Sequence, residues 1–371
     1  MRQNFEVLVV GGGVTGAAIA YGLAKQGVDV CVVDAAPPVD RASRSNMGLV
    51  WCQSKALGHR AYAKWCFESN KLFTNLAEDL KETSGIDIEY TRSGGIIPTL
   101  GEEEFKKRGD YLEALREEAG EDGYPAHMMT REELEAKLPN ITFGEEVTGG
   151  TWCDEDGLVE PLKLMYALRH GMANCGGTLL SHTNVIDVKK NGGSYLVTTD
   201  KGEITCNRLV LAGGLGNRQL GKKFGLDVPV VPNKGQVFLT ERIPDILPSP
   251  LLGICRTRGG TVMIGFEHEY VGTDTSLKTE KFCHVADWAT RVWPALADLR
   301  IIRTWSCLRV WPKDAFPIYD RIPGHNNAFV INAHSAVTLA AVHVKELPKF
   351  IMGEEICDTA AGFTLSRFDE K

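Results

Sequence analysis

Three glycines near the start of the chain have the spacing of a phosphate-binding turn. Gly11, Gly13 and Gly16 follow the apolar run 5–10 and precede a helix-forming run. Glycine permits the tight turn, the close approach of backbone to a pyrophosphate and the packing of helix on strand. The free N–H groups of a helix N-terminus attract phosphates. Asp34 ends the next apolar run and can accept hydrogen bonds from a ribose 2′-hydroxyl. The pattern predicts an adenine dinucleotide site.

Helical and strand-like patterns alternate around this motif. Helices are expected at 59–84, 102–118, 161–174, 278–292 and 336–351, and the capping box of 130–133 opens another. Strands are expected within 86–100, 149–157, 178–188, 195–199, 208–212, 229–241, 255–266 and 328–332. The α/β elements cluster at 1–85, 146–225 and 320–371, which predicts a discontinuous Rossmann-type domain. Segments 86–145 and 226–319 are expected to form an α+β substrate domain with a mainly antiparallel sheet.

Length and composition indicate an ordinary globular enzyme. The 371 residues exceed the usual size of one core, and 43% are hydrophobic and 24% charged. A net charge of −7 argues against nucleic acid or an anionic membrane as the main partner. The ten cysteines include no C-x-x-C pair, which argues against a metal site or iron–sulfur cluster in this chain. Scattered cysteines and the lack of a signal-peptide pattern predict a cytoplasmic protein without a membrane span.

Three later segments join the N-terminal motif in a recognisable order. A strand at 208–212 runs into Gly213 and Gly214, the segment 305–312 contains Arg309, and 329–335 leads into a small-residue stretch. Together they resemble the FAD-dependent superfamily of D-amino acid oxidase, glycine oxidase and sarcosine oxidase over nearly the whole chain. The stretch 334–341 is most similar to the β subunits of bacterial opine (octopine and nopaline) dehydrogenases and to related hydroxyproline dehydrogenases.

The resemblance implies that the Rossmann-type domain binds FAD. In the family, a strand near Val185 touches adenine, and the last helix points its N-terminus at the pyrimidine edge of the flavin, where it stabilises negative charge. The alternatives are a solvated loop at 43–48 and an ordinary helix start capped by Ser335. The implied cofactor residues are Gly11, Gly12, Gly13, Val14, Thr15, Gly16, Asp34, Ala35, Ser43, Arg44, Ser45, Asn46, Met47, Gly48, Val185, Ala212, Gly213, Gly214, His334, Ser335, Ala336, Val337 and Thr338.

Arg309 is the candidate for substrate binding, because the matching arginine of glycine oxidase-like proteins pairs with the substrate carboxylate. A structural arginine in a surface ion pair is the alternative. The active-site wall is expected to include Trp51, Gln53, Lys55, Glu267, His268 and Glu269. A lysine near the flavin often favours oxygen chemistry in such enzymes, and the sequence leaves open whether Lys55 or Lys234 serves.

The resemblance implies an FAD-dependent dehydrogenase of secondary amines. A hydride leaves the carbon next to nitrogen, and the imine hydrolyses to a 2-oxo acid and an amino acid. The best-fitting substrate is an opine, D-octopine or D-nopaline, oxidised by this chain as the catalytic β subunit of a complex with α and γ partners. An iron–sulfur cluster is expected only in a partner, and FMN can sit between subunits.

Several alternatives stay open. They are a D-hydroxyproline, proline or glycine dehydrogenase, a stand-alone glycine, sarcosine or D-amino acid oxidase, and a non-catalytic flavin electron-transfer subunit. The interpretation as an NAD(P)-dependent enzyme is supported only by the N-terminal glycine motif.

Overall fold

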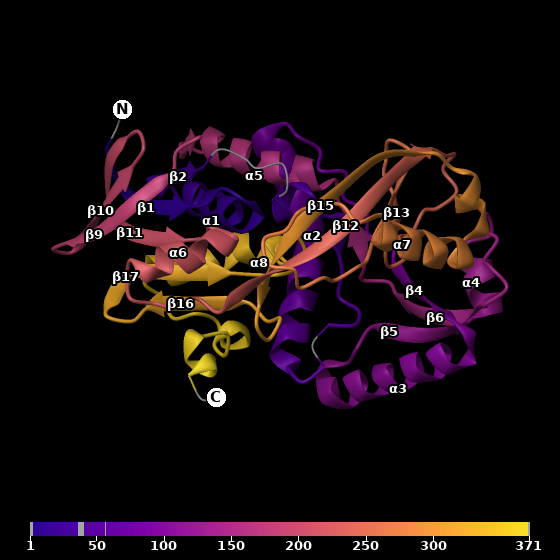
Figure 1. The fold of residues 1–371 in the computed structure, drawn as a ribbon. Helices are drawn as coiled ribbons and strands as arrows, with labels where there is room; N and C mark the ends of the chain where they lie inside the picture. The colour runs from indigo at the N-terminus through magenta and orange to yellow at the C-terminus, as the bar shows by residue number, and fades with distance from the viewer. Residues whose placement is uncertain (1–2, 36–40, 56, 370–371) are drawn as a thin grey trace.

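The computed structural model describes residues 3–35, 41–55 and 57–369, and its largest sheet contains the N-terminal motif (Figure 1). The strand order is β16-β17-β11-β1-β2-β8, with β10 paired to β11 and β9 to β10. The central pairs β1–β2, β1–β11, β2–β8 and β11–β17 are parallel. The strands are β1 Asn4–Val10, β2 Val30–Asp34, β8 Thr178–Ser181, β9 Val185–Asn191, β10 Ser194–Thr199, β11 Gly202–Leu211, β16 Ile318–Ile322 and β17 His325–Asn332.

Both faces of this sheet are buried, so β1 is apolar along most of its length. Val7 and Val9 face a cluster that includes helices α1 Val14–Lys25, α2 Arg60–Ser84, α5 Pro161–Asn174 and α8 Ala340–Lys345. Leu8 and Val10 face a second cluster with β9, β10 and the short helix α6 Asn217–Lys222. Helix α1 contacts both α5 and α8. The approach to α8 is close, since a Cβ on Gly22 would lie 3.0 Å from the carbonyl carbon of Val344.

The rest of the chain forms antiparallel sheets around a separate apolar cluster. One sheet has the order β13-β14-β12-β15, and β15 pairs with residues 230–240 of β12. A three-stranded sheet, β4-β6-β5, carries α3 and α4. The bounds are β4 Gly95–Leu100, α3 Gly101–Ala119, β5 Ala126–Thr130, α4 Arg131–Lys137, β6 Val147–Cys153, β12 Val230–Arg242, β13 Ile254–Arg256, β14 Thr261–Ile264, α7 Thr279–Val292 and β15 Ile301–Pro312.

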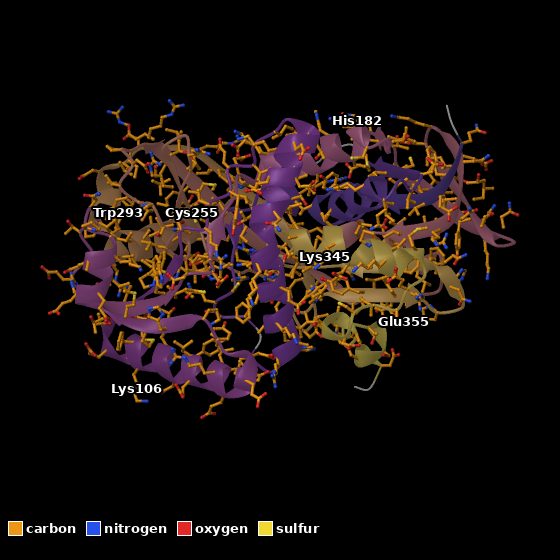
Figure 2. The ribbon with its side chains drawn as sticks, turned by 180° about the vertical axis from the view of Figure 1, so that it is seen from behind. Lys106, His182, Cys255, Trp293, Lys345 and Glu355 are labelled. Carbon is orange, nitrogen blue, oxygen red and sulfur yellow. The ribbon has the colours of Figure 1, made fainter. Side chains whose placement is uncertain are left out.

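Helix α2 runs between these two parts. Seen from behind, it separates the part that contains Cys255 and Trp293 from the part that contains Lys345 (Figure 2). Strands β3 Leu49–Val50 and β7 Gly157–Leu158 form a separate two-stranded antiparallel sheet. The remaining short helices are η1 Ala42–Arg44, η2 Gly120–Asp122, η3 Gly214–Gly216, η4 Pro294–Asp298, α9 Leu347–Met352, η5 Asp358–Ala360 and η6 Leu365–Phe368.

The α/β class with a parallel sheet and separate antiparallel sheets is confirmed. The capping box is also present, because Thr130 and Glu133 exchange side-chain to backbone hydrogen bonds. The strand expected at 178–188 is two strands, β8 and β9, and His182 between them has φ of +54°.

The single helix expected at 336–351 is wrong. Residues 334–339 are turns, and two short helices, α8 and α9, follow. Pro348 has no N–H to donate to the carbonyl four residues before it, which favours the break between α8 and α9 at this point. At the front, the N–H of Ala340 bonds to the carbonyl of Val337, three residues back, instead of that of Ala336.

The division into two domains stays a prediction. Strand β6 lies inside the segment 146–225 that the sequence assigned to the FAD-binding domain, yet it pairs with β4 and β5. We therefore propose to count Val147–Cys153 with the substrate domain. Of the helices in the described ranges, none combines the length and the apolar character that crossing a membrane requires.

Candidate active site

A cavity of about 1010 Å³ opens at the carboxyl ends of the parallel strands and continues to the β12–β15 pair. Ligands of open α/β sheets bind at this end of the strands. Val10 and Asp34 end β1 and β2 at the cavity, and Asn332 ends β17 there. Val237 of β12 and Arg309 of β15 line the opposite region. The cavity thus brings segments from both halves of the chain together.

The glycine turn is tightly constrained. Gly11 has φ of +107°, and a Cβ there would lie 2.6 Å from the carbonyl oxygen of Ala212. A Cβ on Gly16 would collide with the carbonyl of Gly11, so helix and turn meet without side chains between them. Gly13 precedes α1, and the N–H of Val14 donates to Oγ of Ser43 at 3.0 Å. Gly11, Gly13, Val14 and Thr15 line the cavity, whereas Gly12 and Gly16 support the turn from behind.

Asp34 and two arginines hold the turn. Oδ2 of Asp34 accepts the N–H of Gly12 at 2.6 Å, and Nη1 of Arg41 lies 3.2 Å from Oδ1. Arg169 donates from Nε to the carbonyl of Gly12 at 2.7 Å, and its Nη2 lies 3.6 Å from Asp34. Both arginines line the cavity, and neither was among the sequence-predicted residues. No residue predicted from the sequence lies at helical spacing from Arg169, so the local pattern gave no signal for it.

The loop 43–48 faces the cavity with one exception. Ser45 is buried, and its carbonyl accepts the indole N–H of Trp305 at 3.2 Å. Asn46 shapes the turn, because its Oδ1 accepts the N–H of Gly48 and its Nδ2 donates to the carbonyl of Ala42. The cavity-lining members are Ser43, Arg44, Asn46, Met47 and Gly48. A freely solvated loop, the alternative interpretation, does not fit this placement.

Two buried asparagines fix the small-residue turn Ala212–Gly214. Asn217 accepts the N–H of Gly213 at 2.9 Å and donates to the carbonyl of Leu211 at 2.9 Å and to Oδ1 of Asn332 at 2.8 Å. Asn332 donates to the carbonyl of Gly214 at 3.0 Å. Ala212, Gly213 and Gly214 then line the cavity, as do Ala35 and Val185. The sequence analysis missed both asparagines.

The predicted residues 334–338 line the cavity as a series of turns. Ser335 accepts the phenol O–H of Tyr62 at 3.0 Å. Oγ1 of Thr338 accepts the backbone N–H of Trp51 and the ammonium of Lys55, each at 3.2 Å. Burial, followed by the charge of Lys55, holds the pKa of His334 well below its usual range, so its imidazole is neutral at pH 7. Ala336 and Val337 are part of the same wall.

Arg309 lies in the cavity and not in a surface ion pair. It projects from β15 opposite Asn233 of β12. Its Nη1 donates to Oδ1 of Asn233 at 3.0 Å and to the carbonyl of Glu267 at 2.8 Å. Within residues 3–35, 41–55 and 57–369, no carboxylate lies within ion-pair distance of its guanidinium. His268 lines the cavity beside it, and burial, helped by the charge of Arg309, lowers the pKa of His268 to about 4.

Trp51 and Lys55 line the cavity, but Gln53 between them does not. Gln53 is buried and donates to Oδ2 of Asp156 at 2.7 Å, while its Oε1 accepts from Thr151 at 2.7 Å. The amide therefore ties the loop to the neighbouring sheet.

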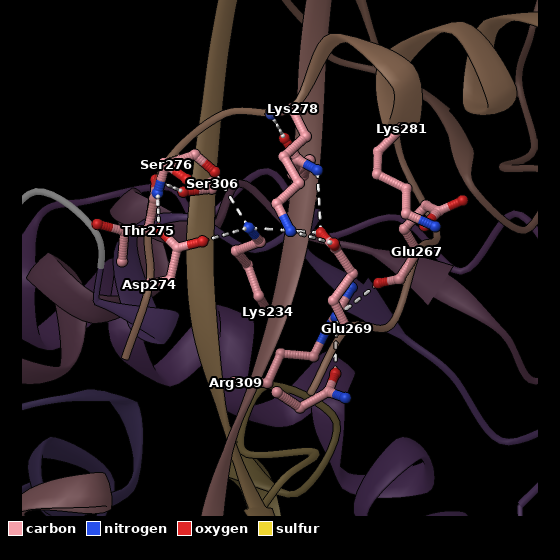
Figure 3. A network of polar contacts seen from close by, with 12 residues as sticks. Lys234, Glu267, Glu269, Asp274, Thr275, Ser276, Lys278, Lys281, Ser306 and Arg309 are labelled. Atoms are coloured by element: carbon pink, nitrogen blue, oxygen red, sulfur yellow. Dashed lines mark hydrogen bonds and ion pairs between the residues drawn. The ribbon is translucent and has the colours of Figure 1, made fainter. Parts of the chain in front are cut away.

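Lys234, Glu267 and Glu269 lie outside the cavity lining, in a network of charges beside it (Figure 3). Lys234 is fully buried, with its Nζ 3.6 Å from Glu269, 3.4 Å from Asp274 and 3.1 Å from the carbonyl oxygen of Ser276. Glu269 also accepts from Gln236 at 3.0 Å. The expectation that the two glutamates form the active-site wall does not fit this placement, because their side chains are engaged with lysines.

The cavity fits a dinucleotide with a small substrate beside it. The glycine turn leaves space that a side chain would fill, and the N-terminus of α1 opens toward it. Trp51 lines the cavity, but its indole N–H is fully buried and has no hydrogen-bond partner among the described protein atoms.

Known proteins are similar to this chain in sequence and in overall structure. The family model described as FAD dependent oxidoreductase matches residues 6–347. The B subunit of opine oxidase from Agrobacterium tumefaciens (strain Ach5) is 33% identical over 363 residues, which cover 98% of this chain and 97% of that protein. The corresponding B subunit from Rhizobium meliloti is 32% identical and covers 98% of each chain. The crystal structure of glycine oxidase from Geobacillus kaustophilus has a TM-score of 0.90 at 25% identity, covering 99% of each chain.

Proposed function

The chain belongs to the family of FAD-dependent oxidoreductases that act on amines and amino acids, and from this premise we propose that it oxidises an opine. D-Octopine and D-nopaline are the preferred substrates, and the products are a 2-oxo acid and an amino acid. The similarity to the B subunits of two opine oxidases supports this choice.

The observation that carries the proposal is the position of Arg309. It faces the same cavity as the glycine turn but at the other end, on β15. Asn233 and the carbonyl of Glu267 hold one edge of its guanidinium. Its Nε and Nη2 form no hydrogen bond to the described protein atoms, which leaves a planar edge for bidentate pairing with a carboxylate.

The residues of the chain orient the substrate and set its protonation. FAD, held by the glycine turn, the loop 43–48 and the segments 212–214 and 334–338, would supply the two-electron acceptor. Arg309 would place the carboxylate so that the carbon next to nitrogen faces the reaction space. His268 and His334 are neutral, and the cations beside them disfavour an ammonium, so the substrate nitrogen is bound as the free amine. The resulting imine hydrolyses in water.

Partner subunits are part of the proposal. Both opine oxidase relatives are named as one subunit of an enzyme, which supports an assembly with further chains. We propose that α and γ partners receive the electrons and that a partner carries any iron–sulfur cluster. FMN at a subunit interface and a cytoplasmic location stay predictions.

The test is anaerobic bleaching of the purified, FAD-loaded chain. D-Octopine, D-nopaline, glycine, sarcosine and D-proline are added in turn, and absorbance is recorded before and after air is admitted. Bleaching by an opine that persists in air is the expected result. Rapid recolouring with peroxide release would instead indicate a self-sufficient oxidase, the class to which the structurally similar glycine oxidase belongs by name. No bleaching by any amine, with partners present, would overturn the proposal.

Two arginine substitutions, one at Arg309 and one control, test the contact between Arg309 and the substrate carboxylate. Arg309→Ala should abolish bleaching at moderate opine concentration while FAD stays bound. Arg300→Ala changes an exposed arginine just before β15 and serves as the matched control. Full activity of Arg309→Ala would exclude the carboxylate contact.

A further inference from the structure

Two cations at the substrate end of the cavity have no anionic partner in the described part of the chain. Lys55 and Arg309 both line the cavity, and neither forms an ion pair with a described carboxylate. Burial raises the pKa of the Asp156 carboxyl, and the charge of Lys55 opposes this shift, but the carboxyl forms no ion pair with Lys55. It accepts the backbone N–H of Cys52 and the side-chain amide of Gln53. Both residues are only partly buried, and a ligand that displaces the cavity water would have to pair them, because cations removed from water are costly unless they are paired. The pair therefore indicates missing negative charge.

The nucleotide end of the cavity has its own charge partners. Arg41 and Arg169 surround Asp34, and Lys223 pairs with Asp187 at 3.2 Å. Arg44 of the loop 43–48 also lines the cavity without an ion pair to a described carboxylate, and the pyrophosphate of a dinucleotide at the glycine turn would supply its negative charge. In contrast, the charges of Lys55 and Arg309 both act on His334, which places the two cations around the same imidazole. The phosphates of a dinucleotide at the glycine turn would thus leave Lys55 and Arg309 uncompensated.

Both cations are held so that donors remain free. Lys55 uses one of its three ammonium donors on Oγ1 of Thr338 at 3.2 Å. The same oxygen accepts the N–H of Trp51, and the Thr338 hydroxyl donates to the carbonyl of Leu49 at 3.3 Å. Arg309 uses only Nη1, on Asn233 and Glu267. Each cation is fixed in place with capacity for one carboxylate.

We propose that Lys55 and Arg309 bind the two carboxylates of a single substrate, so that the site selects secondary amines with a carboxylate on each nitrogen substituent. This assignment rests on the proposed function, because it defines the substrate class of the same site. Opines have this arrangement, since their nitrogen joins an amino acid to a second carboxylated carbon. Glycine and sarcosine carry one carboxylate and would leave one of the cations unpaired.

The test compares two unreactive ligands that differ by one carboxylate. Diglycolate has an ether oxygen in place of the amine nitrogen between two carboxymethyl groups, and methoxyacetate has the same skeleton with one carboxylate fewer. Their dissociation constants are measured by titration calorimetry on the FAD-loaded full-length chain. Diglycolate is expected to bind at least about tenfold more tightly than methoxyacetate, as one additional charged pair predicts.

Three variants test whether Lys55 causes the preference for diglycolate over methoxyacetate. Lys55→Met should reduce the ratio to about one while leaving the affinity for methoxyacetate unchanged, and Lys55→Arg should retain it. Lys71→Met, at an exposed position of α2, is the matched control and should behave as the unmodified chain. Equal binding of both ligands by the unmodified chain, or an undiminished ratio in Lys55→Met, would overturn the assignment.

The two proposals fail in different ways. If an amine bleaches FAD but the unmodified chain binds the two ligands equally, the two-carboxylate site is wrong and the oxidation stands. If diglycolate is preferred through Lys55 but no amine bleaches FAD with partners present, the dicarboxylate site stands and the opine oxidation is wrong.

Discussion

The guanidinium of Arg309 lies directly over Gly235. A Cβ on Gly235 would be 2.6 Å from Cζ of Arg309, well inside van der Waals contact. The two residues come from neighbouring strands, because Gly235 pairs with Cys307 in the β12–β15 register. Glycine weakens a strand interior and often marks a close approach. Here the missing side chain provides the space in which Arg309 extends toward the cavity.

Gly235→Ala should therefore displace Arg309 without removing it. The methyl group forces the guanidinium off Asn233 and the carbonyl of Glu267. We expect the dissociation constant of methoxyacetate to rise about tenfold or more, since overpacking and loss of a positioned charge each cost about 1–3 kcal/mol. Bound FAD per chain should not change. Gly259→Ala, in the turn between β13 and β14, is the control, because a Cβ there meets only Oγ1 of Thr257 at 3.7 Å. Unchanged ligand affinity in Gly235→Ala would refute the spacing argument.

Local patterns in the sequence were sufficient to predict the phosphate turn. Gly16 is required by its contact with the carbonyl of Gly11 in the same strand–turn–helix unit, and Gly11 is required locally by its φ of +107°, although the atoms that a Cβ there would meet belong to Ala212 and Gly213. The position of Arg309 followed from the order of three segments. By contrast, Asn217 donates a hydrogen bond to Asn332, a residue far along the chain. Gly235 likewise leaves space for the guanidinium of Arg309, a residue on another strand. No short-range pattern contains such pairs.

Glu267 and Glu269 were wrongly expected at the cavity wall because they are adjacent in sequence to His268. His268 faces the cavity, whereas the adjacent Glu267 and Glu269 turn to lysines on the other side. Successive side chains of extended backbone alternate between faces. Similarity to a family identifies the segment 267–269 but does not show which of its side chains face the cavity. That depends on how the segment pairs with β12, and here the bridge between Lys234 and Glu269 sets the pairing.

Asn217→Ala should destabilise the fold and loosen FAD together. Its amide is buried and bridges Gly213, Leu211 and Asn332, so truncation leaves several polar groups unsatisfied. The free energy of unfolding should fall by about 2–3 kcal/mol, and the dissociation constant of FAD should rise. The free energy of unfolding is measured by chemical denaturation, and the dissociation constant of FAD is measured by flavin fluorescence. Arg218→Ala, at the exposed neighbouring position, should change neither. A stable variant with full FAD affinity would mean that the network does not hold the turn.

Lys234→Met should reduce stability without altering reaction with oxygen. Lys234 is fully buried between Glu269 and Asp274, and removal of one member of a buried charge network costs about 3–5 kcal/mol. Because its ammonium does not reach the cavity, the reoxidation rate of dithionite-reduced FAD in air should stay the same. Lys278→Met removes a half-exposed partner of the same Glu269 and should cost at most about 1 kcal/mol. Slower reoxidation specific to Lys234→Met would assign this lysine to the oxygen reaction after all.

His343 should make the fold sensitive to mild acid. Its imidazole is fully buried and hydrogen-bonded to the phenol of Tyr319 at 2.8 Å, and burial lowers its pKa to about 3. An unfolded histidine titrates near about 6.5, so below that pH the unfolded chain binds a proton that the folded chain excludes. Stability is lost as pH falls from about 6.5 toward 3, and this residue alone should cost about 2 kcal/mol between pH 7.5 and 5. His343→Gln does not titrate and should lose correspondingly less over the same interval, as measured by urea unfolding. The same substitution at exposed His127 controls for the loss of an imidazole as such. Parallel losses in the unmodified chain and His343→Gln would show that this histidine is not the acid-sensitive group.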